Sequence, residues 1–230
     1  SSNCTGDKVL TGNSCGGKYE KCIEPLQYLY SDRTLSAEII PGKSVIGIAV
    51  DPENRLAVAI DYIMTTGWGG YGIDIPTLEN TPSSGAGIYV RGERDSYLIR
   101  DGKANTAKIL AYGRSNGISY PAAEAAYNYQ PGSCSSSSWC GRGNWYLPSN
   151  WQVFPYFDNR ATIHLMLKAI NKMPDDWWYT RNDFYTVTSN EINAKESGFI
   201  YINTGGMAHG GKNLTEPDNL QTLVLPYITY

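Results

Sequence analysis

The sequence predicts a single α+β domain that combines an antiparallel sheet with two to four helices and long loops. Three observations predict this fold class. The runs "KSVIGIAV" and "RLAVAID" are β-rich, and residues 51–54 ("DPEN") between them are typical of a hairpin turn. Capped segments with helical periodicity occupy the middle of the chain, and β-rich runs return after Pro174. We place the domain at residues 26–230, after a short cysteine-rich lead-in at 1–25.

The first half of the domain is predicted to contain strands, a long loop and then two helices. The segment "LQYLYSDRTLSAEI" is extended in places and is turned at Asp32. Residues 66–95 are rich in glycine, and a loop of this length inside a domain is usually functional or disordered. Asp101 can cap a helix over "GKANTAKILAYG", which we expect to end at Gly113. Pro121 suits the first position of a second helix, "YPAAEAAYNY".

Residues 143–149 ("GNWYLPS") are predicted to form a short aromatic strand that leads directly into a helix. Ser149 and Gln152 have the S-x-x-Q spacing of a capping box. Because neighbouring residues of a strand face opposite sides, we expect Trp145 and Leu147 to point into the core and Tyr146 to point away from it.

The remainder of the chain is predicted to hold one further helix and then antiparallel strands. Pro155 is expected to break the helix after Ser149, and Asp158 to cap a new one over "NRATIHLMLKAINK". The expected strands are 177–181, 184–188, 198–204 and 222–229, with a turn at 203–206.

Several of these segments, taken in order over residues 28–230, resemble one bacterial family. The segments are "IGIAVD", "DGKANT", "WYLPS", "WWYT", "GFIYINTGG" and "LVLPYITY". They are similar to the DUF1566 / Fibrobacter succinogenes major paralogous domain group, and the resemblance implies a C-type-lectin-like fold on a surface or secreted protein. It does not carry over a lectin calcium site, because "TEPDN" at 215–219 follows "RND" at 181–183 instead of preceding it. We therefore expect no metal or other cofactor, although carboxylate and carbonyl oxygens alone suffice to bind calcium.

Composition and charge exclude several classes of partner. The net charge is −3 and the chain has no run of lysine or arginine, which disfavours nucleic acid as a partner. There is no apolar run of about 18 residues, so we expect no membrane span. A charged fraction of 18% with 24 glycines and 18 tyrosines suits a loop-rich extracellular domain, so we expect a secreted or cell-surface protein.

The five cysteines predict one disulfide and leave others open. Cys134 and Cys140 flank a serine-rich loop and are expected to close it as a small ring. The pairing of Cys4, Cys15 and Cys22 is not determined by their spacing. Because the total is odd, one N-terminal cysteine is a candidate link to another chain or to an upstream segment.

Exposed aromatic and polar side chains on the long loops are the predicted ligand-binding residues. Rings with polar groups nearby supply the stacking and hydrogen bonds that a sugar site needs. Packing of these rings in the core is the competing interpretation, because large aromatic residues are mostly buried. The predicted set is Trp68, Tyr71, Trp139, Trp178, Arg181 and Asp183.

These patterns favour a non-enzymatic, adhesin-like recognition module that binds a glycan or a cell-surface protein. One alternative is a polysaccharide-acting enzyme that uses two opposed carboxylates. The other is a structural tip domain of a surface appendage. The chain has no P-loop, no H-E-x-x-H and no G-x-S-x-G motif, so we expect no catalytic residues. The carboxylates that the enzymatic alternative would draw on are Asp175, Asp176, Asp183, Glu191 and Glu196.

Overall fold

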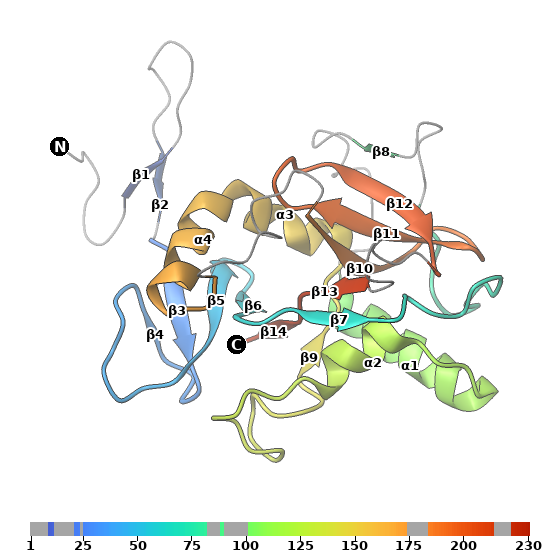
Figure 1. The fold of residues 1–230 in the computed structure, drawn as a ribbon, viewed down its shortest axis with the longest axis horizontal. Coiled ribbons are helices and arrows are strands. Elements are labelled where there is room, and N and C mark those ends of the chain that lie inside the picture. The colour runs from blue at the N-terminus through green and yellow to red at the C-terminus, as the bar shows by residue number, and fades with distance from the viewer. Residues whose placement is uncertain are drawn as a thin grey trace, which may run out of the picture.

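The computed structural model describes residues 25–81, 101–173, 184–213 and 222–230, and the backbone of three short strands at 9–11, 21–23 and 88–89. Within these residues the chain is an α+β protein whose strands all pair antiparallel (Figure 1). The predicted α+β class is confirmed at this level. The division at residue 25 stays a prediction.

The largest sheet has six strands and brings both ends of the described domain together. The strand at 45–51 pairs with the strand at 27–30 and not with the intervening strand at 35–36. The strand at 227–229 lies between two segments that are far from it in sequence. In spatial order the strands are β4 (Leu35–Ser36), β3 (Gln27–Tyr30), β5 (Val45–Asp51), β6 (Leu56–Ala59), β14 (Tyr227–Thr229) and β9 (Trp145–Tyr146).

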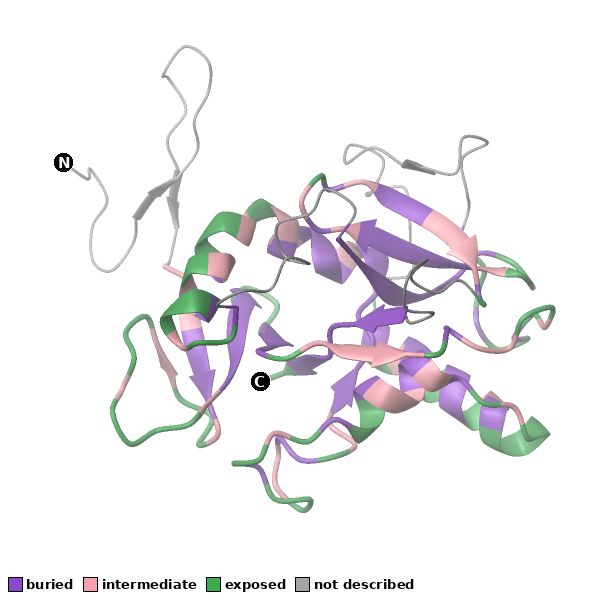
Figure 2. Ribbon diagram, viewed as in Figure 1, coloured by how far each residue is buried: buried purple, intermediate pink, exposed green. Residues whose placement is uncertain are grey.

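Alternation along these strands divides the residues of the sheet between two hydrophobic clusters. On β6, Leu56 and Val58 belong to one cluster, while Ala57 and Ala59 belong to the other. The first cluster includes residues of the helices that follow β9, and the second includes Trp145. Figure 2 shows that most of these strands are buried. The predicted hairpin over residues 51–54 is confirmed, because β5 and β6 pair directly.

The remaining strands form a four-stranded sheet and two two-stranded ribbons. The four-stranded sheet runs β10 (Tyr185–Glu191), β11 (Glu196–Tyr201), β12 (Met207–Gly211) and β8 (Ile88–Tyr89). One ribbon pairs β7 (Ile63–Thr65) with β13 (Thr222–Val224), and the other pairs β1 (Val9–Thr11) with β2 (Lys21–Ile23).

Four helices occupy the described part of the chain, in two pairs. The first pair packs beside the β7–β13 ribbon and the second over the large sheet (Figure 1). The helices are α1 (Gly102–Asn116), α2 (Pro121–Asn128), α3 (Asn150–Asp158) and α4 (Arg160–Ala169).

Two expected helix boundaries are wrong, each for a local reason. Helix α1 passes Gly113 and ends at Gly117, whose φ of 62° is the left-handed conformation that glycine adopts readily. Helix α3 continues through Pro155, and the break comes at Asn159, which also starts α4 in place of Asp158. The Asn159 side-chain amide donates to the Pro155 carbonyl over 2.9 Å, so the break is stabilised after the proline and not at it.

The strand expected at 222–229 is two strands with different partners. Strand β13 pairs with β7, whereas β14 pairs with β6 and β9. Pro226 lies between them and has no amide hydrogen for a ladder, while its carbonyl accepts from the Ala59 amide over 2.9 Å. The strands at 184–188 and 198–204 correspond to β10 and β11, and the strand at 177–181 lies outside the described residues.

The segment around β9 connects all three hydrophobic clusters of the domain. Trp145, Tyr146 and Leu147 are at most 2% exposed, and each belongs to a different cluster. The expected burial of Trp145 and Leu147 is confirmed. Tyr146 does face the other way, but that side is also core, because α3 and α4 cover it. The capping box of Ser149 and Gln152 is present as predicted.

The disulfide between Cys134 and Cys140 is confirmed, with Cα atoms 5.6 Å apart. Both cysteines are buried in the cluster that contains Ala57, Ala59 and Trp145. The Trp145 indole N–H donates to the Cys140 carbonyl over 2.8 Å, so the ring of residues 134–140 is fixed to the core.

Loss of this disulfide is expected to lower the free energy of unfolding by about 2–3 kcal/mol, the range for closing so short a loop. The measurement is chemical denaturation of a Cys134→Ser/Cys140→Ser variant against the oxidised parent. Peptide mapping without reductant provides the control. Free alkylation of both thiols in the parent protein would contradict the pairing itself.

Candidate functional site

A groove between α1 and α2 is the strongest candidate for a ligand site among the described residues. Its volume is about 510 Å³, within the usual range of small-ligand sites. Three chain segments form it: the C-terminal half of α1 with the connection to α2, one side of α2, and Arg142 from the segment that follows the disulfide ring. The lining residues are Leu110, Gly113, Arg114, Gly117, Ile118, Ser119, Tyr120, Glu124, Tyr127, Asn128 and Arg142.

Two glycines allow the sharp turn that creates the groove. Gly117 ends α1, and its amide is bonded to the Gly113 carbonyl. A Cβ atom on Gly113 would lie 2.7 Å from the Ile118 carbonyl oxygen, so only glycine lets the connection fold back onto α1. The glycine that was expected to stop α1 therefore has a packing role instead.

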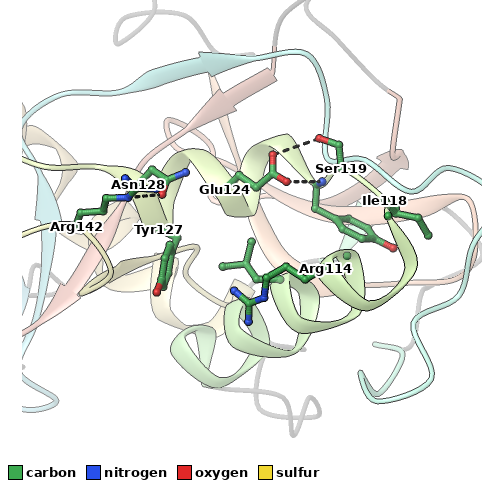
Figure 3. A pocket seen from close by; sticks show the side chains of 11 residues that line it. Arg114, Ile118, Ser119, Glu124, Tyr127, Asn128 and Arg142 are labelled. Atoms are coloured by element: carbon green, nitrogen blue, oxygen red, sulfur yellow. Dashed lines mark hydrogen bonds between the residues drawn. The ribbon is translucent and has the colours of Figure 1, made fainter.

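The groove has a buried floor and a polar rim. Leu110 and Tyr120 are 8% and 1% exposed and form part of the floor. Burial raises the pKa of Tyr120 to about 12, so its phenol stays neutral at ordinary pH. Exposed side chains of Arg114, Tyr127 and Arg142 line the rim, as Figure 3 shows.

The charged groups of the groove differ in how many hydrogen bonds they make within the protein. The Glu124 carboxylate accepts from the Ser119 hydroxyl over 3.2 Å and from the Tyr120 amide over 3.4 Å. It thereby satisfies the start of its own helix, where a negative charge is favourable. Arg114 makes no hydrogen bond or ion pair with any residue that the structure describes. Arg142 donates through Nε to Asn128 over 2.8 Å, and within the same described ranges its terminal nitrogens have no protein acceptor.

Tyr127 presents a ring between the two arginines. Its side chain is 38% exposed, which makes it one of few large exposed hydrophobic residues in the described ranges. The chain returns past this ring at Gly143, whose amide donates to the Tyr127 carbonyl over 2.7 Å. Gly143 has a φ of 95°, and a Cβ there would come within 3.4 Å of the Tyr127 hydroxyl. Glycine thus positions the loop that carries Arg142 against α2.

Trp68, from the predicted binding set, is packed inside the protein. It is 2% exposed, its indole N–H donates to the Thr188 carbonyl over 2.8 Å, and its ring meets Tyr120 edge-on at 5.7 Å. Lys212 Nζ lies 5.0 Å from the centre of the same ring. These contacts anchor the first part of the 66–95 loop in the core.

The structure does not bring Trp68 and Trp139 together. Trp139 is half-buried in a different cluster, donates to the Ser31 carbonyl over 2.9 Å and has Arg33 4.9 Å from its ring centre. Tyr71 is 51% exposed. Trp178, Arg181 and Asp183 lie outside the described residues, so the role of the six-residue set in ligand binding stays a prediction.

A buried ion pair fixes the loop that contains Trp68. The side chains of Glu191 and Lys212 are both 0% exposed, with Lys212 Nζ 2.6 Å from a Glu191 oxygen and 2.6 Å from the Ile73 carbonyl. The Glu191 carboxylate also accepts from the Ile75 amide over 3.1 Å. Burial raises the pKa of Glu191 to about 7, although Lys212 acts to lower it. This pair connects β10, the end of β12 and the loop.

The carboxylates of the enzymatic alternative are spread over different environments. Glu191 is bound to Lys212, and Glu196 is paired with His209, which helps to lower the pKa of Glu196 after the larger effect of Asn193. Asp175, Asp176 and Asp183 lie outside the described residues. In the described ranges no group of three or more His, Cys, Asp or Glu side chains is placed to hold a metal ion.

The groove residues were not identified from the sequence. Arg114 is a basic residue in the last turn of a helix, which the helix dipole favours anyway. Arg142 lies 28 positions later, two residues after Cys140, and its spacing from Arg114 does not indicate that the two side chains share a groove. Two short helices joined by a four-residue connection were the available signal, because such helices must pack against each other.

Comparison with known proteins adds one structural neighbour. No family model and no curated protein matches this chain. A fimbrial protein from Bacteroides ovatus, solved by crystallography, matches with a TM-score of 0.56 and 14% sequence identity. The alignment covers 89% of this chain and 48% of the neighbour, so the chain spans about half the length of that protein. At this identity the match concerns the fold.

The helices also bear on membrane insertion. Within the described ranges, none combines the length and the apolar character that crossing a bilayer requires.

Proposed function

We propose that this chain is a non-enzymatic recognition module of a bacterial cell-surface appendage and that the α1–α2 groove binds its ligand. The observation that carries the proposal is the combination, in one groove, of an exposed ring and two arginines with unused hydrogen-bond donors. The ring and the free guanidinium nitrogens are therefore available on the rim to an incoming ligand. The fold similarity to a fimbrial protein supports the appendage setting.

The finer fold assignment belongs to the same proposal. The "WYLPS", "GFIYINTGG" and "LVLPYITY" segments support a C-type-lectin-like domain of the DUF1566 kind. On this proposal the ligand is a glycan or a cell-surface protein, the location is the cell surface or the secreted fraction, and no cofactor is needed. An N-terminal cysteine remains a candidate link to a neighbouring chain.

The proposal is tested with a Tyr127→Ala variant on arrays of glycans and of extracellular proteins. We expect the parent protein to bind a subset of probes. The variant should bind them about tenfold more weakly, because removing the ring removes its stacking contact with the ligand. Leu165→Ala is the control, because Leu165 is 67% exposed on α4, does not line the groove and is not among the predicted binding residues. Equal binding by both variants would remove the groove from the proposal.

A structural tip or stalk domain is the second candidate. It is favoured by the fold similarity to a fimbrial protein. This candidate predicts ordered assemblies of the chain, visible by electron microscopy, that form equally well with Tyr127→Ala. Monomeric behaviour of the chain together with groove-dependent binding would exclude it.

A further inference from the structure

We infer that the ligand of the α1–α2 groove carries a carboxylate and is an acidic sugar, an inference that rests on the function proposed above. Arg114 and Arg142 lie on opposite sides of Tyr127 in Figure 3, one from the end of α1 and the other from the segment that follows the disulfide ring. The groove therefore offers two cationic groups and one ring to the same occupant.

The charge balance of the groove selects an anion. Among its lining residues there are two arginines and one acid, and that acid is already engaged by Ser119 and the Tyr120 amide. Glu124 thus satisfies the first turn of α2 and neutralises neither guanidinium. The described protein offers no carboxylate to Arg114 or Arg142, so an incoming anion meets no internal competitor.

The chemistry of the two arginines suits a carboxylate. A guanidinium presents paired N–H donors whose spacing matches the two oxygens of a carboxylate. Asn128 holds the Nε of Arg142 over 2.8 Å and so orients the plane of that group, while its terminal nitrogens remain available. Arg114 is exposed at the end of its helix and can adjust its position to the ligand.

The remaining groups favour a sugar over a peptide. Tyr127 offers an exposed ring, which suits the apolar C–H face of a pyranose. Ser119 and Asn128 on the same rim provide short polar groups for hydroxyls. The groove has a volume of about 510 Å³, which is enough for one or two sugar units. A stable protein partner would have to cover roughly 800 Å² of this chain, and so would contact surface beyond the groove.

The experiment uses the full chain on an array that contains four matched sets of probes. These are neutral glycans, glycans with terminal uronic or sialic acid, the same acidic glycans after reduction of the carboxylate to an alcohol, and sulfated glycans. Acidic peptides form a fifth set. The variants are Arg114→Gln and Arg142→Gln, with Lys108→Gln as the control because Lys108 is exposed on α1 and does not line the groove. Thermal unfolding of each variant confirms that it is folded.

We expect the parent and Lys108→Gln to bind the acidic glycans, with loss of about tenfold or more in each arginine variant and on carboxylate reduction. Groove-dependent binding of neutral glycans, sulfated glycans or acidic peptides in preference to the carboxylated set overturns this inference but leaves the proposed function intact. Binding of acidic glycans that both arginine variants retain also overturns it. Absence of groove-dependent binding to every set overturns this inference, and absence of groove-dependent binding to the extracellular proteins as well overturns the proposed function.

Discussion

Replacing Lys212 with methionine is expected to lower the free energy of unfolding by about 3–5 kcal/mol near pH 8, the cost of leaving one partner of a buried ion pair alone. Methionine retains most of the aliphatic volume, so the loss comes from the polar end of the side chain. The Glu191 carboxylate loses its cation and the Ile73 carbonyl loses a donor, both at 2.6 Å in the parent protein.

The cost of this substitution is expected to be smaller near pH 5 than near pH 8. Burial already raises the pKa of Glu191 to about 7 with Lys212 present, and removing Lys212 removes an effect that lowers it. The pKa of Glu191 is then higher in the folded variant than in the unfolded chain, so the folded variant binds this proton more tightly. Proton binding by Glu191 therefore stabilises the folded variant fully below the unfolded-state pKa, and this stabilisation is lost as the pH rises through the folded-state pKa.

Chemical denaturation of parent and variant at both pH values measures this effect. Lys195→Met is the matched control, because Lys195 is an exposed lysine on the same β-hairpin and should change stability little at either pH. A Lys212→Met variant as stable as the Lys195→Met control would show that the pair does not hold the loop. A cost independent of pH would show that Glu191 does not take up the proton.

Replacing Leu147 with alanine is expected to lower the free energy of unfolding by about 2–5 kcal/mol. Leu147 is 0% exposed and belongs to the cluster formed by α1, α2 and the β10–β11 strands. Its amide is held by the Thr106 hydroxyl over 3.0 Å, and this contact fixes the backbone at the end of β9. The backbone therefore cannot move far to fill the space, which places the expected loss in the upper part of the range.

Leu165→Ala is the matched control for this measurement. Leu165 lies on α4 with 67% of its side chain exposed, so the same chemical change there removes almost no buried contact. We expect a difference of several kcal/mol between the two variants in urea or guanidinium denaturation. Similar midpoints for both would mean that Leu147 contributes nothing to the core.

The local features of the fold were readable because each depends on residues a few positions apart. Asp101 caps α1, Ser149 and Gln152 form the capping box, and Cys134 and Cys140 pair across a six-residue separation. In each case one side chain satisfies a group that its own segment exposes. Where local rules competed, as with Gly113 against Gly117 as the end of α1, packing against Ile118 decided the outcome.

The tertiary structure alone decided which surfaces were left for a ligand. Trp68 was predicted to bind ligand because it is an aromatic residue on a glycine-rich loop, but the buried Glu191–Lys212 pair and the Thr188 carbonyl hold that loop in the core. Arg114 had no distinguishing sequence signal, yet the segment that follows the disulfide ring brings Arg142 to the same groove. The α+β class, the caps and the disulfide could therefore be predicted from the sequence, because they depend on residues that lie close together in the chain. The groove depends on contacts between segments far apart in the chain, and only folding brings those segments together.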